Sequence, residues 1–293
     1  MRNSLQGRLY CLLLFTAATP HDPSRAFANA GTASPVRVCR EWIEGRPWAL
    51  QERAENKTRI LSADAACYDG TIERGSLADL NAWLDDAGRG ARTPVLVVRS
   101  RGGDADEALI FAEKLQAKDA EVHVVQLCGS SCANWLYAGV RRRHVVGRAL
   151  ILYHGGFSDL TRERALAAFD AFVPEPGGPK SDDPERDRAE LVKRFISMQR
   201  RQDALYRRIG VSPQIVHGVD ALDTAKLDPS RCGGDTSRPR NFVYFGTRQM
   251  RRLGVAPVSG SPEMTPANVN AALAALDVDF VACLAPDPLV LRN

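Results

Sequence analysis

The sequence predicts an α/β protein built on a parallel sheet. The short apolar runs TPVLVVRS, EVHVVQL and RALILYH are rich in β-branched residues, which is typical of strands buried on both faces. Segments with a helical spacing of apolar residues lie between these runs. Strands that alternate with helices form parallel sheets with right-handed crossovers. We therefore expect a single α/β domain.

The first predicted units run from residue 70 to residue 117. GTIERGSLADLNAWLDDA reads as a strand end, a turn and a helix with Leu77, Leu80 and Leu84 on one face. After the strand TPVLVVRS, RGGDADEALIFAEKLQA predicts a glycine turn and a second helix. The inward residues of that helix are expected to be Ala108, Phe111, Ala112 and Leu115.

Polar and glycine residues follow three successive predicted strands. Gly102-Gly103 comes after TPVLVVRS, Ser130-Ser131 lies between EVHVVQL and the helix CANWLYAG, and His154 ends RALILYH. Ligands of parallel sheets gather outside the carboxyl ends of the strands. We therefore expect these residues to lie together.

The sequence after His154 shows fewer patterns that predict secondary structure. FVPEPGGPKSDDPERDR is rich in proline, glycine and charge and predicts a mobile lid over residues 172–188. The strand FVYF, the short helix TRQMRRLGV ended by Gly254, and a helix around PANVNAALAAL are expected in an otherwise irregular C-terminal part. A long amphipathic helix is expected between the lid and these elements, with Leu191, Phe195, Met198, Leu205 and Ile209 on its apolar face.

The N-terminus is typical of a secretory signal peptide. Basic residues precede the apolar run LYCLLLFTAA, which is too short to span a bilayer, and Ala28-Asn29-Ala30 fits a cleavage site. An earlier cut near Ala18 and an uncleaved membrane anchor are the alternatives. We expect a periplasmic or secreted protein without stable membrane insertion after the signal is removed.

Cysteine usage agrees with export. Removing Cys11 with the signal leaves an even number of cysteines, which favours disulfides in an oxidising compartment. No CxxC pair or HxxxH helix indicates zinc, so neither a metal nor a cofactor is expected. The sequence does not fix the connectivity, and pairing neighbours along the chain predicts Cys39 with Cys67, Cys128 with Cys132, and Cys232 with Cys283.

The formal net charge of +4 is small. The basic clusters RRRH and KRFISMQRRQ lack interleaved aromatic residues, so nucleic-acid binding is not expected.

The strand-end residues have the chemistry of a serine hydrolase. A serine that opens a helix is exposed, and the helix N-terminus favours developing negative charge. A Gly-Gly turn offers backbone N–H groups, and a histidine on the next strand end supplies a base.

These segments resemble a known family. VRSRGGDADEALIFAEKL, CGSSCANWLYAG and ALILYHGG are similar to the Clp protease/crotonase superfamily, in particular to its Clp-protease-like serine peptidases. The resemblance covers residues 68–157, with an echo at NFVYFGTRQMRRLGV. It implies a Clp protease/crotonase-like ββα superhelix and a homo-oligomer. It also implies Ser130 as nucleophile, His154 as base, and Gly103 and Ser131 as oxyanion-hole donors.

Details of the implied site stay open. The ungapped match favours Ser130, and a shift of one residue would make Ser131 the nucleophile. The orienting third residue is either Asn241 or Asp235, because no acid stands where the family places one. Cys128 and Cys132 would close a short loop around the turn, and a Ser-Lys variant would use Lys193.

The leading hypothesis is an exported peptidase that acts on a peptide or protein substrate. The alternatives are a non-catalytic binding or scaffold protein of the same fold and a coenzyme A enzyme of the crotonase type, against which export argues. The expected organisation is a signal peptide over residues 1–30, an irregular extension over 31–60, the Clp-protease-like domain over 61–257 and an irregular extension over 258–293.

Overall fold

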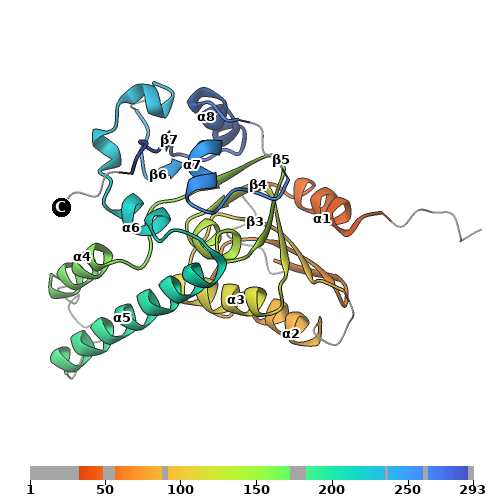
Figure 1. The fold of residues 1–293 in the computed structure, drawn as a ribbon, viewed down its shortest axis with the longest axis horizontal. Coiled ribbons are helices and arrows are strands. Elements are labelled where there is room, and N and C mark those ends of the chain that lie inside the picture. Colours follow the sequence, from red (N-terminus) through yellow and green to blue (C-terminus); the bar gives the residue numbers. More distant parts are fainter. Residues whose placement is uncertain are drawn as a thin grey trace, which may run out of the picture. The chain divides into compact units, whose positions relative to one another are not determined.

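A five-stranded sheet forms the centre of the protein (Figure 1). The computed structural model describes residues 33–48, 57–87, 92–171, 183–234, 237–259 and 263–289. The strand order is β1-β2-β3-β4-β5, with β2 to β5 parallel and β1 antiparallel to β2. The predicted parallel α/β sheet is thus confirmed. The strands are β1 (Thr58–Ser62), β2 (Ala65–Asp69), β3 (Val95–Ser100), β4 (Glu121–Gly129) and β5 (Arg142–Leu152).

Helices and a small second sheet complete the described chain. The second sheet pairs β6 (Phe242–Tyr244) with β7 (Ala282–Leu284) in parallel. The helices are α1 (Pro35–Glu44), α2 (Ala78–Ala87), α3 (Ala105–Ala117), the π-helix η3 (Cys132–Tyr137), α4 (Asp159–Asp170), α5 (Pro184–Ile209), α6 (Gln214–Asp220), the 3₁₀ turns η4 (Thr224–Lys226) and η5 (Pro229–Cys232), α7 (Thr247–Arg252) and α8 (Pro266–Ala275).

The two faces of the sheet are covered differently. Leu96 and Val98 of β3 point into the main core, which α2, α3 and η3 complete. The alternate residues Val95 and Val97 point to the other face, where α1 packs. Figure 1 shows α2 and α3 together on one side of the sheet and α1 apart from them. Burial on both faces explains why the strands read as continuous apolar runs.

Local signals determine the two helices that frame the site. Asp104 caps α3 by accepting a hydrogen bond from the Glu107 N–H at 2.9 Å. Asp183 caps α5 in the same way, Pro184 occupies its first turn, and Gly210 ends it in the left-handed conformation. The long amphipathic helix predicted after the lid is therefore confirmed.

Several boundaries differ from the prediction. The segment expected as an irregular N-terminal extension contains α1, and the C-terminal extension contains β7 in addition to the expected helix α8. The sequence patterns did not predict α1 or β7, and β7 has only 3 residues that are ordered by pairing with β6. Residues 184–188 of the expected lid belong to α5, while residues 172–182 and the expected signal peptide, residues 1–30, lie outside the described residues.

Three disulfides join the expected cysteine pairs. They are Cys39–Cys67, Cys128–Cys132 and Cys232–Cys283. The first links α1 to β2, and the last links η5 to β7. Disulfides of this number are typical of proteins in oxidising compartments. Among the described helices, none combines the length and apolar character needed to cross a bilayer.

A buried ion pair braces the centre of the sheet. Arg99 on β3 is 2% exposed and Asp69 on β2 is 1% exposed. Arg99 donates to both carboxylate oxygens, from Nε at 2.7 Å and from Nη2 at 2.9 Å. It also donates to the Arg46 carbonyl at 2.9 Å and to the Gln126 side chain. Gln126 has a left-handed φ of 56° where the register between β4 and its neighbours shifts. The ion pair therefore supports the irregular part of β4 that leads to Ser130.

We predict that Asp69→Ala lowers the free energy of unfolding by about 3–5 kcal/mol, because Arg99 would keep a buried charge without its partner. Asp85→Ala is the matched control, since its pair with Lys114 is exposed and is expected to contribute about 0–1 kcal/mol. Urea unfolding monitored by circular dichroism measures both. Equal losses in the two variants would contradict the bracing role.

Candidate active site

Ser130 occupies a strained turn between β4 and η3. Its φ of 54° lies in the left-handed region, which residues with a side chain adopt rarely. The turn is held from both sides: the Ser130 N–H donates to the Leu152 carbonyl at 2.9 Å, and the Asn134 N–H donates to the Ser130 carbonyl at 2.9 Å. Backbone strain concentrates at functional sites, and nucleophilic serines at strand-to-helix turns share this feature.

His154 lies directly after β5 and faces Ser130. The Ser130 Oγ and the His154 Nε2 are 2.5 Å apart, within hydrogen-bond distance. The His154 ring packs against Phe242 of β6 in an edge-to-face arrangement, with ring centroids 5.0 Å apart. Tyr153 and Val243 exchange two backbone hydrogen bonds of 2.8 Å, so β6 holds the end of β5 in place. The structure thus brings together the expected nucleophile and base.

The surroundings of His154 lower its pKa. Desolvation of the ring is the largest cause, although part of the side chain reaches solvent. A hydrogen bond to its own backbone and the negative charge of Asp220 act in the opposite direction. The pKa falls below the ordinary value of 6.5, so the imidazole is neutral at pH 7 and is able to accept a proton.

Asp220 at the end of α6 is a carboxylate near His154 whose charge acts on the histidine. Both residues line a pocket of about 420 Å³. The Asp220 carboxylate accepts hydrogen bonds from Thr161 Oγ1 at 2.7 Å, from Arg164 Nη1 at 2.8 Å and from Ser158 Oγ. It therefore acts on His154 through its field rather than through one of these bonds. The sequence offered no sign of this residue, because QIVHGVDAL reads only as a short apolar segment.

Of the described residues predicted to orient or replace the histidine, Asn241 alone is seen to line the pockets at the site. Asn241 lines the 420 Å³ pocket with His154 and also a second pocket of about 290 Å³ that contains Ser130. Asp235 lies outside the described residues. Lys193, the base of the Ser-Lys alternative, belongs to α5 and is not among the lining residues of either pocket.

The Gly-Gly turn packs directly against the serine turn. Gly102 has a φ of 93°, and a Cβ there would lie 2.6 Å from the Ser130 Cβ and 2.8 Å from the Ser131 nitrogen. Gly103 has a φ of 140° and approaches the Ile72 carbonyl so closely that a Cβ would lie 2.0 Å from it. The Gly102 N–H donates to Ser100 Oγ at 3.0 Å, so this amide serves the turn itself. The Gly103 N–H is thus the better candidate for an oxyanion donor.

Ser131 has a different environment from Ser130. Its side chain is 2% exposed, and no described residue accepts or donates a hydrogen bond at its Oγ. Ser131 already has the helical backbone of η3, with φ −58° and ψ −30°. Its hydroxyl is therefore buried away from the pocket, while its backbone nitrogen lies beside Gly102.

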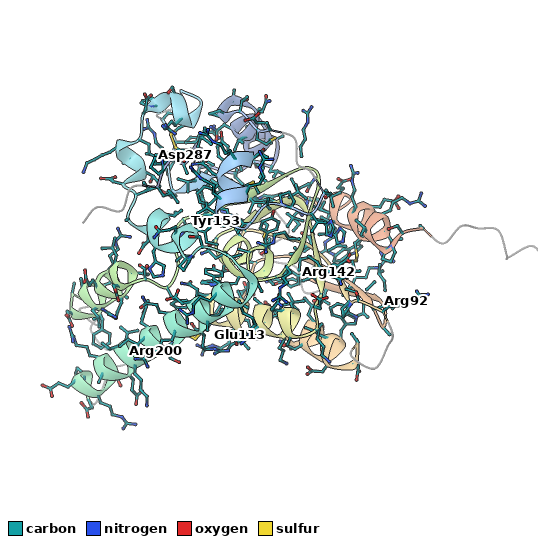
Figure 2. The ribbon with its side chains drawn as sticks, in the orientation of Figure 1. Arg92, Glu113, Arg142, Tyr153, Arg200 and Asp287 are labelled. Carbon is teal, nitrogen blue, oxygen red and sulfur yellow. A yellow bond between two sulfur atoms is a disulfide. The ribbon has the colours of Figure 1, made fainter. Side chains whose placement is uncertain are left out.

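The helix after the serine turn is tied to the loop that carries His154. The Asn134 side chain donates to the Gly155 carbonyl, and Tyr206 of α5 donates to the Asn134 carbonyl at 2.6 Å. Gln202 of α5 bonds both the N–H and the C=O of Phe157, at 3.2 Å and 2.9 Å. Figure 2 labels Tyr153, the residue before His154, among the side chains close to α6 and the sheet. Hydrogen bonds therefore connect the segments that carry Ser130 and His154 to each other and to α5. The π-helical form of η3 also agrees with a functional site.

The 290 Å³ pocket beside Ser130 offers groups of mixed chemistry. Arg101 and Asp279 contribute opposite charges, and Phe242 and Phe280 contribute rings that are tilted by 34° with centroids 4.5 Å apart. Leu127 and Leu152 add aliphatic surface. Such a lining suits an extended chain with both apolar and charged groups.

Comparisons with known proteins leave the family open: no protein-family model matches this chain, and no curated protein matches it significantly.

We predict separate effects for two of the disulfides. Cys128–Cys132 closes a loop of 4 residues around Ser130, so its loss as Cys128→Ser/Cys132→Ser is expected to cost about 2 kcal/mol in chain entropy. Cys232–Cys283 spans 51 residues, and Cys232→Ser/Cys283→Ser is expected to cost about 4 kcal/mol.

The rate of labelling by a fluorophosphonate probe is expected to fall more in the Cys128→Ser/Cys132→Ser variant than in the Cys232→Ser/Cys283→Ser variant, because only the first disulfide holds the serine turn. Chemical unfolding and the labelling rate measure the two effects. A Cys128–Cys132 double variant that labels as fast as wild type would contradict a positioning role for this disulfide.

Proposed function

We propose that this chain is an exported serine hydrolase of the Clp-protease-like kind, with Ser130 as nucleophile and His154 as base. The observation that carries the proposal is the 2.5 Å contact between the Ser130 Oγ and the His154 Nε2 at the end of a parallel sheet. The left-handed turn at Ser130 and the lowered pKa of His154 support it. The chain order of Gly-Gly turn, serine and histidine on successive strand ends matches the resemblance described above.

The geometry supports acyl transfer in two stages. His154 Nε2 removes the proton of Ser130 Oγ as this oxygen attacks the carbonyl carbon of the substrate. Negative charge then develops on the carbonyl oxygen, and the N–H groups of Gly103 and Ser131 are the candidate donors to it. His154 returns the proton to the leaving group. Water then attacks the acyl carbon as His154 takes its proton, and this proton passes to Ser130 Oγ as the bond between Oγ and the acyl group breaks.

We infer a peptide or protein substrate. The pocket beside Ser130 combines charges of both signs with aromatic and aliphatic surface, which fits the varied side chains of a polypeptide better than a small apolar ester. Export also removes the chain from the cytoplasm, where coenzyme A esters occur.

A non-catalytic binding protein is the second candidate, and one observation favours it. The hydrogen bonds of the Asp220 carboxylate run to Ser158, Thr161 and Arg164, so His154 lacks the direct carboxylate partner of a complete triad within the described chain. The same pocket would then bind a polypeptide without cleaving it.

We predict that Ser130→Ala abolishes labelling by a fluorophosphonate probe and lowers hydrolysis of an activated ester at least ~1,000-fold. Ser131→Ala is the matched control. It is expected to keep measurable activity and unchanged or slightly higher stability, because it removes a buried hydroxyl without a described partner and leaves its backbone N–H in place.

Loss of activity in Ser131→Ala with retention in Ser130→Ala would show that the nucleophile is the neighbouring serine. Absence of labelling and of hydrolysis in the wild-type protein would favour the binding protein.

We predict an acid limb in the pH profile of kcat/KM with its midpoint below pH 6.5. Only neutral His154 accepts the serine proton, so activity is lost as the pH falls through its pKa, which desolvation has lowered. Asp220→Asn removes a charge that raises this pKa, so the limb is expected to move to still lower pH.

Asp203→Asn is the control, since its described partner His217 lies on α6 rather than at the serine. A limb that stays in place or moves upward in Asp220→Asn would contradict the electrostatic role of Asp220.

A further inference from the structure

Two histidines and a glutamate meet at the beginning of β4 and β5, at the opposite end of the strands from Ser130. Glu121 and His123 lie on β4, and the parallel register places His144 of β5 beside His123. The two imidazole rings stack with their centroids 4.2 Å apart and their planes within 6°. Their side chains are 15% and 20% exposed, and that of Glu121 is 28% exposed. The group thus lies in a half-buried position on the face that α1 covers in part.

The three side chains direct ligand atoms to one point. His123 Nε2 is 3.3 Å and His144 Nε2 is 4.0 Å from the same oxygen, Glu121 Oε2. One potential ligand atom from each residue lies within 4.8 Å of the others. A zinc ion holds nitrogen and oxygen ligands at about 2.0–2.2 Å. Side-chain rotations that tilt the rings away from parallel would therefore close the three atoms around such an ion.

The local charges suit a divalent cation. Arg142 donates to the other carboxylate oxygen, Glu121 Oε1, at 3.4 Å and pairs with Asp119 at 2.9 Å. Arg142 therefore orients Glu121 and leaves Oε2 free to face the imidazoles, and the two carboxylates outweigh its positive charge.

We propose that Glu121, His123 and His144 form a binding site for a divalent transition-metal ion of the zinc, nickel or copper class. Two imidazole nitrogens and one carboxylate oxygen are a donor set that these ions prefer over magnesium or calcium. The sequence did not indicate this site, because Glu121 and His123 lie on β4, His144 lies on β5, and the register of the two strands brings them together. The site joins the strands β4 and β5 about 20 Å from the serine turn, given the rise of a strand. Its role is to stabilise the sheet, and it takes no part in the proposed hydrolysis.

The test uses the full mature protein with its affinity tag removed and its metals stripped by a chelator. Isothermal titration with Zn²⁺ is expected to show about one equivalent bound. A concentration of free Zn²⁺ about 100-fold above Kd is expected to raise the Tm by roughly 5–10 °C. A Co²⁺ titration followed by visible absorption reports the donor set independently of activity.

Variants of the ligands locate the ion. His123→Ala, His144→Ala and the isosteric Glu121→Gln are each expected to weaken Zn²⁺ binding at least ~10-fold and to lose the rise in Tm. His217→Ala, which changes a histidine on α6, is the control and is expected to bind as wild type does. The proposal is overturned if wild type binds no Zn²⁺, if the three variants bind as tightly as wild type, or if only His154→Ala loses binding.

Discussion

The strained turn at Ser130 is the feature on which the proposed site depends. A serine in the left-handed conformation needs support from its surroundings. Gly102 makes room by lacking a side chain, the Leu152 carbonyl and the Asn134 N–H hold the backbone, and the Cys128–Cys132 disulfide closes the loop. The direction of the Ser130 side chain follows from these contacts. The hydroxyl meets His154, while the next serine turns into the core.

The sheet behind this turn contains a buried ion pair close to the place where the strands become irregular. Arg99 and Asp69 pair in the interior, and Arg99 also bonds Gln126, where the register of β4 shifts. A register shift changes which residues reach the end of a strand and how they point. The buried ion pair therefore supports the irregular part of β4. The position of Ser130 at the end of this strand depends on that support as well as on its own contacts.

The sequence predicted the parts of this protein that local patterns determine. Apolar β-branched runs located β3, β4 and β5, helical spacing located α3 and α5, and neighbouring cysteines paired as expected. Residues brought together by long-range packing were beyond such patterns. Asp220 reaches His154 only through the packing of α6, and His123 meets His144 only through the register of two strands. The ungapped match favoured Ser130 over Ser131, but the contact of Ser130 with His154 and the burial of Ser131 follow from the conformation of the turn, which no local pattern reveals.

Peptide mapping after reaction with diisopropyl fluorophosphate tests the central claim most directly. The reaction joins a serine oxygen to phosphorus, releases fluoride and passes the serine proton to the base, so it marks a serine that is activated by a neutral histidine. The account predicts one added phosphoryl group per chain, located by tandem mass spectrometry on Ser130, and none after His154→Ala. Modification of Ser131 or of a serine outside the pocket, or modification that persists in His154→Ala, would contradict it.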